Sequence, residues 1–448
     1  MTIGKLWQDY WFRPAALFNL AVCRITCVAA QLVSIFLDHD YLMEHAGLPD
    51  HFYDPLPIVR LILWPISLIY GDPLFRPSYE SISIIHFVAI GAGFFALTGA
   101  LTRISLPLFA FGSLFLHSFR WSFGDFHHPD AVLIIFLCVL SLSPAGKSLS
   151  VDDLLSRMRG ATQRRRFETP GLSEATNRFA SFPLLLGQVL LALIYLNAAL
   201  AKLWVSGLDW MNGYTLQYYL FRDGAARGSE IAAWLGQHHI LAVLLSWLTM
   251  IFEGAFPLVL FVPSLVWVFL PLGLILHLGM ASTNLAFFYQ YLALYTVFVP
   301  WDRVVSWARG ALGNNKLQVV FDGECLLCIR SMTFVSYWDW FDRLAYTDLR
   351  HATPDLAAAA GGSLDAGPAE MLAVWPSGLV RKGFFAWRDI VWRLPALWPL
   401  LPLLWLPGMS LLGPKVYQKI AAARARFQSC ENGVCYGHDR LSSQSTGK

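Results

Sequence analysis

Charge is scarce in this chain. Of its 448 residues only 14% are charged, whereas 56% are hydrophobic and 15% are aromatic. An ordinary soluble domain is about 25% charged, so a water-soluble fold for the whole chain is excluded. The net charge of +3 is too small to indicate a nucleic-acid partner, and we expect none. The Lys and Arg residues lie between apolar runs, where charge sets membrane topology.

Cysteine is also scarce. Seven residues are too few and too scattered for the disulfide framework of a secreted protein. Cys23, Cys27 and Cys138 lie inside apolar stretches and are interpreted as small hydrophobic residues. No small-residue cleavage site follows the first apolar run, which is therefore interpreted as a first membrane span rather than a signal peptide. The remaining cysteines are Cys325, Cys328, Cys430 and Cys435.

Long apolar runs are abundant before about residue 300. A helix needs about 20 apolar residues to cross a bilayer. The chain therefore predicts an all-α polytopic membrane bundle of about eight spans, followed by a different kind of domain. The spans are expected near residues 16–37, 82–101, 103–118, 129–145, 182–203, 240–262, 264–282 and 284–300.

The strongest cluster of Lys and Arg lies between residues 147 and 178. Because positive charge marks cytoplasmic loops, we expect this stretch inside the cell, with residues 155–178 forming a flexible linker. An even number of spans then places the N-terminus and the chain after residue 303 in the cytoplasm. The loops 38–81 and 204–239 are expected outside.

The chain changes character after residue 316. LQVVFD predicts a strand, CLLCIRSMTFVSYWDWF a helix, and EMLAVWPSGLVRKG two strands around a turn. This pattern predicts a small thioredoxin-like α/β domain. The apolar run 396–413 contains three prolines and is expected to pack on the membrane surface or on the domain core. We expect a membrane domain over 1–305, a linker over 306–315, the α/β domain over 316–440 and a disordered tail over 441–448.

The sequence Asp322-Gly-Glu-Cys325-Leu-Leu-Cys328 follows a strand and opens a helix. Free backbone N–H groups and the helix dipole stabilise a thiolate at a helix N-terminus, which makes it nucleophilic. A cysteine about one turn later can resolve the mixed disulfide. We therefore expect Cys325 to attack and Cys328 to resolve. A thioredoxin-like site also requires a cis-proline facing the cysteines, and Pro368 is the candidate.

Zinc binding is the alternative role for this pair, with Cys430 and Cys435 of CENGVC supplying the other two thiolates. A structural disulfide is disfavoured in the reducing cytoplasm. The strand–loop–helix setting, and the distance of about 100 residues to the second pair, favour a redox role. We expect no metal.

FDGECLLC and the later GLVRKGFFAWRDIVWRLP resemble the DCC family of thiol-disulfide oxidoreductase-like proteins, which is named for an Asp-x-x-Cys-x-x-Cys core. Asp322, Cys325 and Cys328 match that core. The resemblance covers roughly the last 120 residues. It implies redox chemistry and a thiol redox partner, and leaves the substrate open.

Ionisable residues inside apolar spans are costly, so each is a functional candidate. They are Arg24, His86, Lys202, Glu253 and His277. We expect Glu253 to balance the charge of Arg24, a structural role. Lys202 ends an apolar helix and allows two interpretations: it extends to the membrane interface, or it is partly desolvated and acts as a general base.

In the expected orientation Lys202, His127, His128 and His277 lie toward the outer face of the membrane. There they are expected to converge on one pocket, where histidine exchanges protons or donates hydrogen bonds to an oxyanion. A structural role for each histidine is the alternative.

YLNAALAKLW and the following DWMNGYTLQYY resemble the lysine segment of vitamin K-dependent gamma-carboxylase and of the wider bacterial HTTM (horizontally transferred transmembrane) domain family. HHPDAVLIIF and LHLGMASTNLAFFYQYL are similar to its histidine segments. The resemblance covers roughly residues 10–305. It implies Lys202 as the base that deprotonates a hydroquinone, with His277 and either His128 or, with a shift of one residue, His127 assisting. Substrate-binding positions are expected at Tyr195, Trp210, Gly213 and His127.

The carboxylase also has a large luminal domain, and nothing in this chain matches it. Glutamate carboxylation is therefore not implied. We expect an integral enzyme of a bacterial inner or plasma membrane, carboxylase- or epoxidase-like, that acts on a quinone-like or other lipophilic small molecule and is coupled to a cytoplasmic CxxC domain. A quinone or hydroquinone is the expected cofactor, and the lipid bilayer is the expected surroundings. The alternative is a membrane scaffold or transporter with a redox-regulated or zinc-binding tail.

Overall fold

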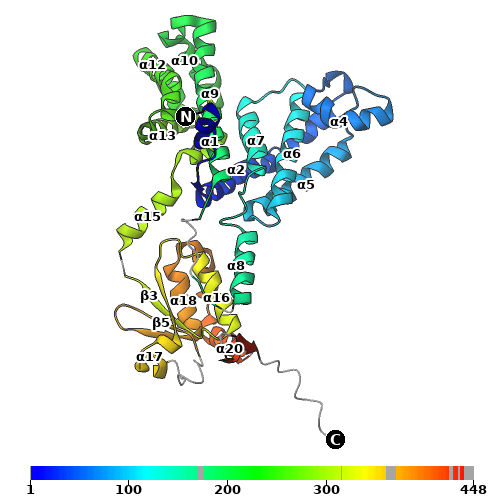
Figure 1. Cartoon of the computed structure of the whole chain (residues 1–448). Helices are drawn as coiled ribbons and strands as arrows, with labels where there is room; N and C mark the ends of the chain where they lie inside the picture. Colours follow the sequence, from blue (N-terminus) through cyan, green and yellow to red (C-terminus); the bar gives the residue numbers. More distant parts are fainter. Residues whose placement is uncertain are drawn as a thin grey trace. The chain divides into compact units, whose positions relative to one another are not determined.

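The chain forms two compact units in a computed structural model, which describes residues 2–164, 166–168, 175–313, 315–359, 370–422, 427–431 and 434–437 (Figure 1). The first unit comprises residues 1–151 and 176–300. The second comprises residues 152–175 and 301–448. The first is helical, and the second holds a mixed sheet.

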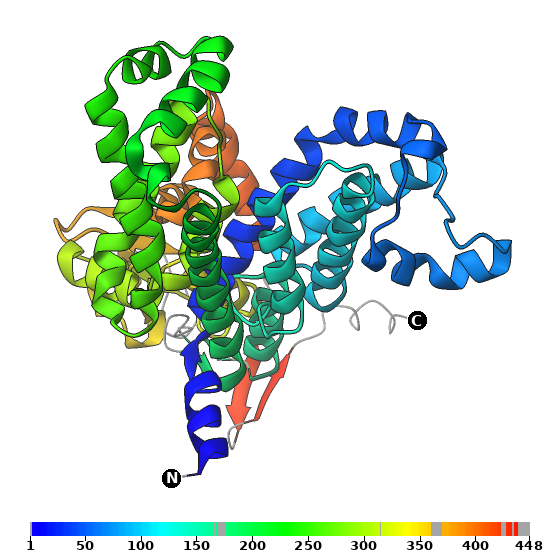
Figure 2. The same cartoon turned by 90° about the horizontal axis from the view of Figure 1, so that it is seen from above.

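The first unit consists of helices and two short paired strands. Figures 1 and 2 show two groups of helices, one coloured blue to cyan and one green. The first group is α2 (Leu17–Leu37), α3 (His39–Gly47), α4 (Pro57–Tyr70), α5 (Tyr79–Thr98), α6 (Thr102–Trp121) and α7 (His128–Ser141), whereas α1 (Ile3–Trp11) lies beside the second group. The second is α9 (Arg178–Ser206), α10 (Tyr214–Tyr219), α11 (Glu230–Gly236), α12 (His239–Ala255), α13 (Val266–Ser282) and α14 (Tyr289–Leu294). Strand β1 (Ala15–Ala16) pairs with β2 (Thr176–Asn177).

Five helical segments among the described residues are long and apolar enough to cross a membrane. They are Leu17–Leu37, Tyr79–Thr98, Arg178–Asn212, His239–Leu260 and Pro263–Ser282. Large apolar side chains on them face outward, such as Trp204 at 92% exposure and Ile240 at 75%. Apolar surface of this extent marks a contact with lipid or with another protein. The first unit is therefore compatible with membrane insertion.

The expected count of eight spans is not confirmed. Helix α7 has 14 residues, too few to cross a bilayer fully. The expected span 284–300 is broken into the short helix α14 and the 3-10 turn Tyr295–Phe298. Asn284 at its start has a φ of 55°, a left-handed conformation that ends the preceding helix.

Arg24 is fully buried in the first unit. Its guanidinium donates hydrogen bonds to the main-chain carbonyls of Ala145, at 2.6 Å, and Leu149, at 2.5 Å. These carbonyls lie in the segment 142–150 that follows α7. Glu253, which was expected to balance the charge of Arg24, instead forms an ion pair with Lys202.

The second unit is built on a four-stranded mixed sheet. Its strands are β3 (Leu317–Phe321), β4 (Leu344–Asp348), β5 (Leu372–Val374) and β6 (Val380–Lys382), in the order β4-β3-β5-β6. Strand β3 is parallel to β4 and antiparallel to β5, and β6 is antiparallel to β5. The predicted strand after residue 316 and the predicted pair around the 376–378 turn are confirmed.

The remaining elements of this unit are mostly helical. They are α8 (Val151–Arg164), α15 (Trp301–Leu312), α16 (Leu326–Tyr337), α17 (Pro354–Ala359), α18 (Gly383–Arg393), η9 (Pro395–Leu400), α19 (Leu401–Leu404), α20 (Met409–Ala422) and the hairpin β7 (Phe427–Glu431) with β8 (Val434–Gly437). Helix α8 replaces part of the expected flexible linker. Its Thr162 accepts a hydrogen bond from Arg330 at 2.9 Å, and its Asp153 accepts one from Tyr337 at 3.1 Å, which hold it to α16.

Alternating residues of β3 divide the core between the two faces of the sheet. Leu317, Val319 and Phe321 pack with apolar residues of α16 and α18 on one face. Val320 packs on the other face, against the segment that leads into α17. Helices α16 and α18 therefore cover one side of the sheet (Figure 1).

Candidate functional site

The loop between β3 and α16 carries the cysteine pair. Asp322 directly follows the strand, and its carboxylate accepts a hydrogen bond from the Glu324 N–H at 3.0 Å. Its main-chain carbonyl accepts another from the Cys325 N–H at 3.3 Å. An aspartate that bonds the backbone two residues later forms a tight turn. Asp322 thus sets the turn that brings Cys325 to the start of α16.

Cys325 is the N-cap residue of α16, with an extended backbone (φ −85°, ψ 115°). Its sulfur accepts a hydrogen bond from the Cys328 N–H at 3.3 Å. This is the capping position, where a side chain accepts from a backbone donor that lacks an intrahelical partner. The expected place of the pair at a helix start is confirmed, and the same donor can stabilise a Cys325 thiolate.

The two sulfurs differ in burial. Cys325 is 0% exposed, whereas Cys328 is half-buried and lines a cavity. An incoming disulfide must reach the sulfur that attacks it. The burial therefore favours Cys328 as the sulfur that meets the substrate, the reverse of the order expected from the sequence.

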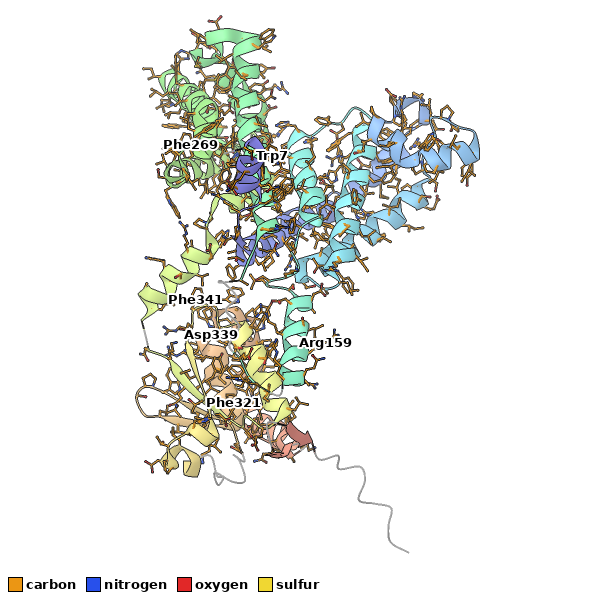
Figure 3. The ribbon with its side chains drawn as sticks, in the orientation of Figure 1. Trp7, Arg159, Phe269, Phe321, Asp339 and Phe341 are labelled. Carbon is orange, nitrogen blue, oxygen red and sulfur yellow. The ribbon has the colours of Figure 1, made fainter. Side chains whose placement is uncertain are left out.

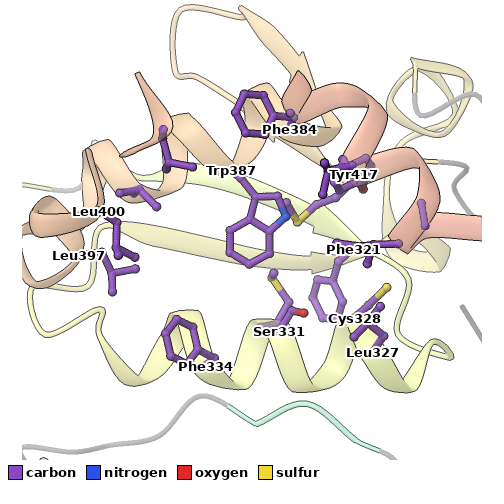
Figure 4. Close-up of a pocket in the computed structure, with 18 of the residues that line it drawn as sticks. Phe321, Leu327, Cys328, Ser331, Phe334, Phe384, Trp387, Leu397, Leu400 and Tyr417 are labelled. Carbon is purple, nitrogen blue, oxygen red and sulfur yellow. Dashed lines mark hydrogen bonds between the residues drawn. The ribbon is translucent and has the colours of Figure 1, made fainter. Parts of the chain in front are cut away.

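The cavity beside Cys328 has a volume of about 580 Å³. Figure 4 shows Cys328, Ser331 and Phe334 on its α16 wall, and Phe384, Trp387 and Tyr417 on the opposite side. These opposite residues come from α18 and α20. Phe321, which lies inside the second unit in Figure 3, also lines it. No local pattern in the sequence indicates this cavity, because it forms where three helices distant in the sequence meet.

A zinc site remains the alternative use of the cysteines. Within the described part of the chain, no three His, Cys, Asp or Glu side chains gather as a metal site. The backbones of Cys430 and Cys435 lie opposite each other in the β7–β8 hairpin, but their side chains are outside the described set. Pro368, the expected cis-proline, also lies outside the described residues.

Lys202 lies near the end of α9 and is largely shielded. Its Nζ donates to Glu253 Oε2 of α12 at 2.5 Å, with the two side chains 23% and 11% exposed. The same ammonium lies 5.0 Å from the centre of the Trp210 ring, a cation–π contact. Lys202 and Trp210, both expected site residues, therefore lie together, and Glu253 is the partner that the sequence reading missed.

Tyr195 and His277 form a second buried polar group. The Tyr195 hydroxyl lies 2.6 Å from His277 Nε2 and 2.6 Å from the Tyr295 hydroxyl. Tyr195 and Lys202 are seven residues apart on α9, so they share one face of the helix. The ring of Phe288 lies 5.8 Å from that of His277 and 5.9 Å from that of His128. His128 and His277 thus border the same aromatic residue.

The other two expected site residues have different surroundings. His127 is mostly exposed and lies 3.4 Å from Asp125. Gly213 has a φ of 86°, and a Cβ atom there would lie 2.8 Å from the backbone nitrogen of Val243. Only glycine fits so close a backbone contact. Gly213 therefore serves the packing of α10 on α12.

A further charged group was missed by sequence reasoning. Arg120 is buried and contacts three carboxylates: Asp38 at 3.1 Å, Asp125 at 3.3 Å and Asp130 at 3.2 Å. Asp130 also accepts a hydrogen bond from Gln290 at 2.5 Å. Arg120 lies just beyond an expected span. An arginine at such a position is normally interpreted as a signal of membrane topology, so the sequence does not indicate that it is buried among carboxylates.

Comparison with known proteins bears on the second unit. Residues 319–430 match the sequence model of the family described as DCC1-like thiol-disulfide oxidoreductase. No curated protein matches, and no solved structure matches. The match contains both cysteines of the pair and most of the α/β unit. The chain therefore carries a DCC1-like thiol-disulfide oxidoreductase domain at residues 319–430.

Proposed function

We propose that the second unit is a thioredoxin-like domain in which Cys325 and Cys328 exchange thiol and disulfide. The observation that carries this proposal is the bond from the Cys328 N–H to the Cys325 sulfur at the N-terminus of α16. The β–α–β and β–β–α order around a β4-β3-β5-β6 sheet supports the fold. The family match supports the chemistry.

In the exchange, the Cys328 thiolate attacks one sulfur of a substrate disulfide, and the other substrate sulfur leaves as a thiolate. Cys325 then attacks Cys328, forms the internal disulfide and releases the second substrate thiol. The Cys325 thiolate is held ready by the backbone donor at the helix start. Its complete burial supports a role in this second, internal step.

The test is the redox state of the purified full chain. After equilibration in glutathione buffers of graded potential, alkylation and peptide mass spectrometry are expected to find a reversible disulfide between Cys325 and Cys328. Cys138, which lies inside an apolar helix, serves as an internal control that stays a thiol. Stoichiometric zinc on the untreated protein, with no reversible disulfide, would contradict the redox proposal and establish the zinc-binding alternative.

For the first unit we propose a carboxylase-like, HTTM-type membrane enzyme that acts on a quinone-like or other lipophilic substrate. Lys202 is the base, and His128 and His277 assist. The shielded contact of Lys202 with Glu253 supports this role, because Glu253 can accept a proton from the Lys202 ammonium and leave the neutral amine as the base. The neighbouring Tyr195–His277 contact offers a second path for protons.

This second proposal is tested by small molecules that co-purify with the protein. Lipid mass spectrometry is expected to find a quinone-like compound with the wild-type protein, and several-fold less of it with Lys202→Ala. Lys147→Ala is the matched control, because Lys147 is an exposed lysine of the same unit. Equal recovery from all three proteins would favour a scaffold or transporter in place of an enzyme.

We propose that the protein resides in a bacterial inner or plasma membrane, with its N-terminus and its second unit in the cytoplasm. The basic residues between 147 and 178 support this orientation. A cytoplasmic thiol pair would meet reducing partners, so its resting state is the dithiol.

A further inference from the structure

The cavity beside Cys328 has the composition of a site for a small apolar molecule. Its volume of about 580 Å³ falls within the roughly 300–1,000 Å³ of small-molecule sites. Its aromatic lining residues are Phe321, Phe334, Phe384, Trp387 and Tyr417. Few polar groups reach it, among them the Cys328 sulfur and the Ser331 hydroxyl. A ligand that fills it is therefore largely apolar, with a flat ring and a small number of acceptors.

Helices α19 and α20 supply one wall of the cavity and a second apolar surface. The segment Pro395–Leu404, which ends in α19, is bent by 109° with respect to α20. Leu404 and Met409 line the cavity, whereas Leu411 and Leu412 are 77% and 54% exposed. An exposed apolar helix face in a chain with membrane-length helices is suited to a lipid surface. A ligand of this cavity can therefore come from the bilayer.

We propose that the cavity binds a lipophilic quinone, which accepts two electrons from the Cys325–Cys328 pair. This inference rests on the proposed redox function of the pair. A peptide would bring many backbone donors and acceptors that this lining cannot satisfy. A quinone brings an apolar ring and tail and only two carbonyl oxygens, to one of which the Ser331 hydroxyl can donate a hydrogen bond.

The reaction balances without another reactant. The two S–H bonds of the pair break and one S–S bond forms, so the cysteines are oxidised by two electrons. The quinone takes up those two electrons and two protons on its carbonyl oxygens and becomes a hydroquinone. Cys328, which lines the cavity, faces the quinone, and buried Cys325 closes the disulfide. The quinone oxidises the cysteine pair within the second unit, so this reaction does not require the Lys202 site of the first unit.

The experiment uses the full chain, reduced and freed of reductant, in lipid nanodiscs without oxygen. Decylubiquinone is added, hydroquinone is followed by absorbance, and each cysteine is followed by peptide mass spectrometry. One hydroquinone per Cys325–Cys328 disulfide is expected. Diamide, a small water-soluble thiol oxidant, is used in parallel. If diamide also fails to form the disulfide, the proposed redox function itself is wrong; if only decylubiquinone fails, the quinone inference alone is wrong.

Two substitutions fill the cavity. Ser331→Leu and Val416→Trp each place a larger side chain at a lining position, and each is expected to raise the half-saturating decylubiquinone concentration about tenfold. Gln418→Trp is the control, because Gln418 is an exposed residue of the same helix, α20, that does not line the cavity, and it should leave that concentration unchanged. All three variants should react with diamide as the wild type does. An equal effect of Gln418→Trp, or none from the two fillers, would overturn the assignment to this cavity.

Discussion

At the scale of single residues, one hydrogen bond and one difference in burial distinguish the two thiols. The Cys325 sulfur accepts from a helix-start N–H and is 0% exposed. Cys328, one turn later, faces the cavity. The sulfur whose thiolate is stabilised by the helix start, Cys325, is therefore not the sulfur that a substrate can reach, Cys328. The usual inference from a CxxC sequence, that the first cysteine attacks, combines two properties that this structure separates.

The separation predicts which single variant traps a substrate. Cys325→Ser retains the accessible sulfur and lacks the resolving one, so mixed disulfides on Cys328 should accumulate several-fold over wild type. Cys328→Ser should trap little, because the remaining sulfur is buried. Non-reducing mass spectrometry of the purified chains measures both. Greater trapping by Cys328→Ser would restore Cys325 as the attacking residue.

Asp339 predicts a pH dependence for the second unit. It follows the end of α16 (Figure 3) and accepts hydrogen bonds from the N–H groups of Arg343, at 2.7 Å, and Leu344, at 3.0 Å. Burial outweighs these bonds and raises the pKa of Asp339 from 3.8 to about 6. The folded state therefore binds the proton more tightly than the unfolded state does. The resulting stability is present below about pH 4 and is lost as pH rises through 6.

The loss amounts to at most about 3 kcal/mol, at about 1.4 kcal/mol for each pH unit of the difference. It is measured as the change, between pH 4 and pH 7, in the urea concentration at which β3 and β4 lose amide-exchange protection. Asp339→Asn should reduce that change. Asp355→Asn is the control, since Asp355 is an exposed carboxylate of the same unit. Identical pH dependence in all three proteins would contradict the prediction.

The Lys202–Glu253 pair predicts an asymmetry between single and double substitution. Glu253→Gln leaves a largely shielded ammonium without its carboxylate, which should cost about 1–3 kcal/mol of stability after allowance for partial exposure. Adding Lys202→Met removes the isolated charge and should recover most of that loss. Thermal unfolding in detergent measures the three proteins. A double variant less stable than Glu253→Gln would show that the pair does not act as a unit.

At the scale of elements, the packing of α20 on α18 closes the cavity. A Cβ atom at Gly413 of α20 would lie 2.4 Å from the Phe384 ring of α18, so a glycine is needed for the two helices to approach. Gly413→Ala is expected to destabilise the second unit by about 1–3 kcal/mol and to raise amide exchange in α20. Gly310→Ala in α15, where a Cβ atom meets open space, should be neutral or stabilise by up to about 1 kcal/mol.

Elements with a strong local signal could be predicted from the sequence. Strand β3, helix α16 and the β5–β6 hairpin have clear periodicity or turn residues. Strand β4 was missed because its run Leu344–Asp348 ends in polar residues. Helix α8 was missed because its charges suggested a linker, whereas two hydrogen bonds to α16 residues hold it. Eight apolar runs were expected to span, yet five helical segments of the described residues are both long and apolar enough to do so.

The candidate sites were predictable to different extents. The setting of the Cys325–Cys328 pair could be predicted, because the strand, the turn and the helix start that define it lie within a few residues of each other in the sequence. Lys202 and Glu253 are 51 residues apart, and their contact depends on how α9 meets α12. The sequence placed a charge in each helix but could not pair them. The cavity depends on three helices and left no local pattern.

At the scale of the whole molecule, a helical unit and a thiol unit are carried by one chain. The proposed orientation predicts that green fluorescent protein fused at either terminus fluoresces in bacteria, because it folds in the cytoplasm. Alkaline phosphatase at the same sites should be inactive. Phosphatase inserted between Gly228 and Ser229, at a turn within the segment 204–239 that is expected outside, should be active. Active phosphatase at the C-terminus would place the thiol pair on the other side.

The complete burial of Cys325 also bears on how the protein ages under oxidative stress. Peroxide takes an accessible thiolate stepwise to sulfinic and sulfonic acids, which are not readily repaired. With Cys325 enclosed and Cys328 half-buried, damage falls first on Cys328. A sulfenic acid there has a reserve thiol within one helical turn, and condensation with it gives a disulfide that reductants can reopen. The enclosed Cys325 sulfur thus protects Cys328 from irreversible oxidation, because the disulfide between them can be reduced again.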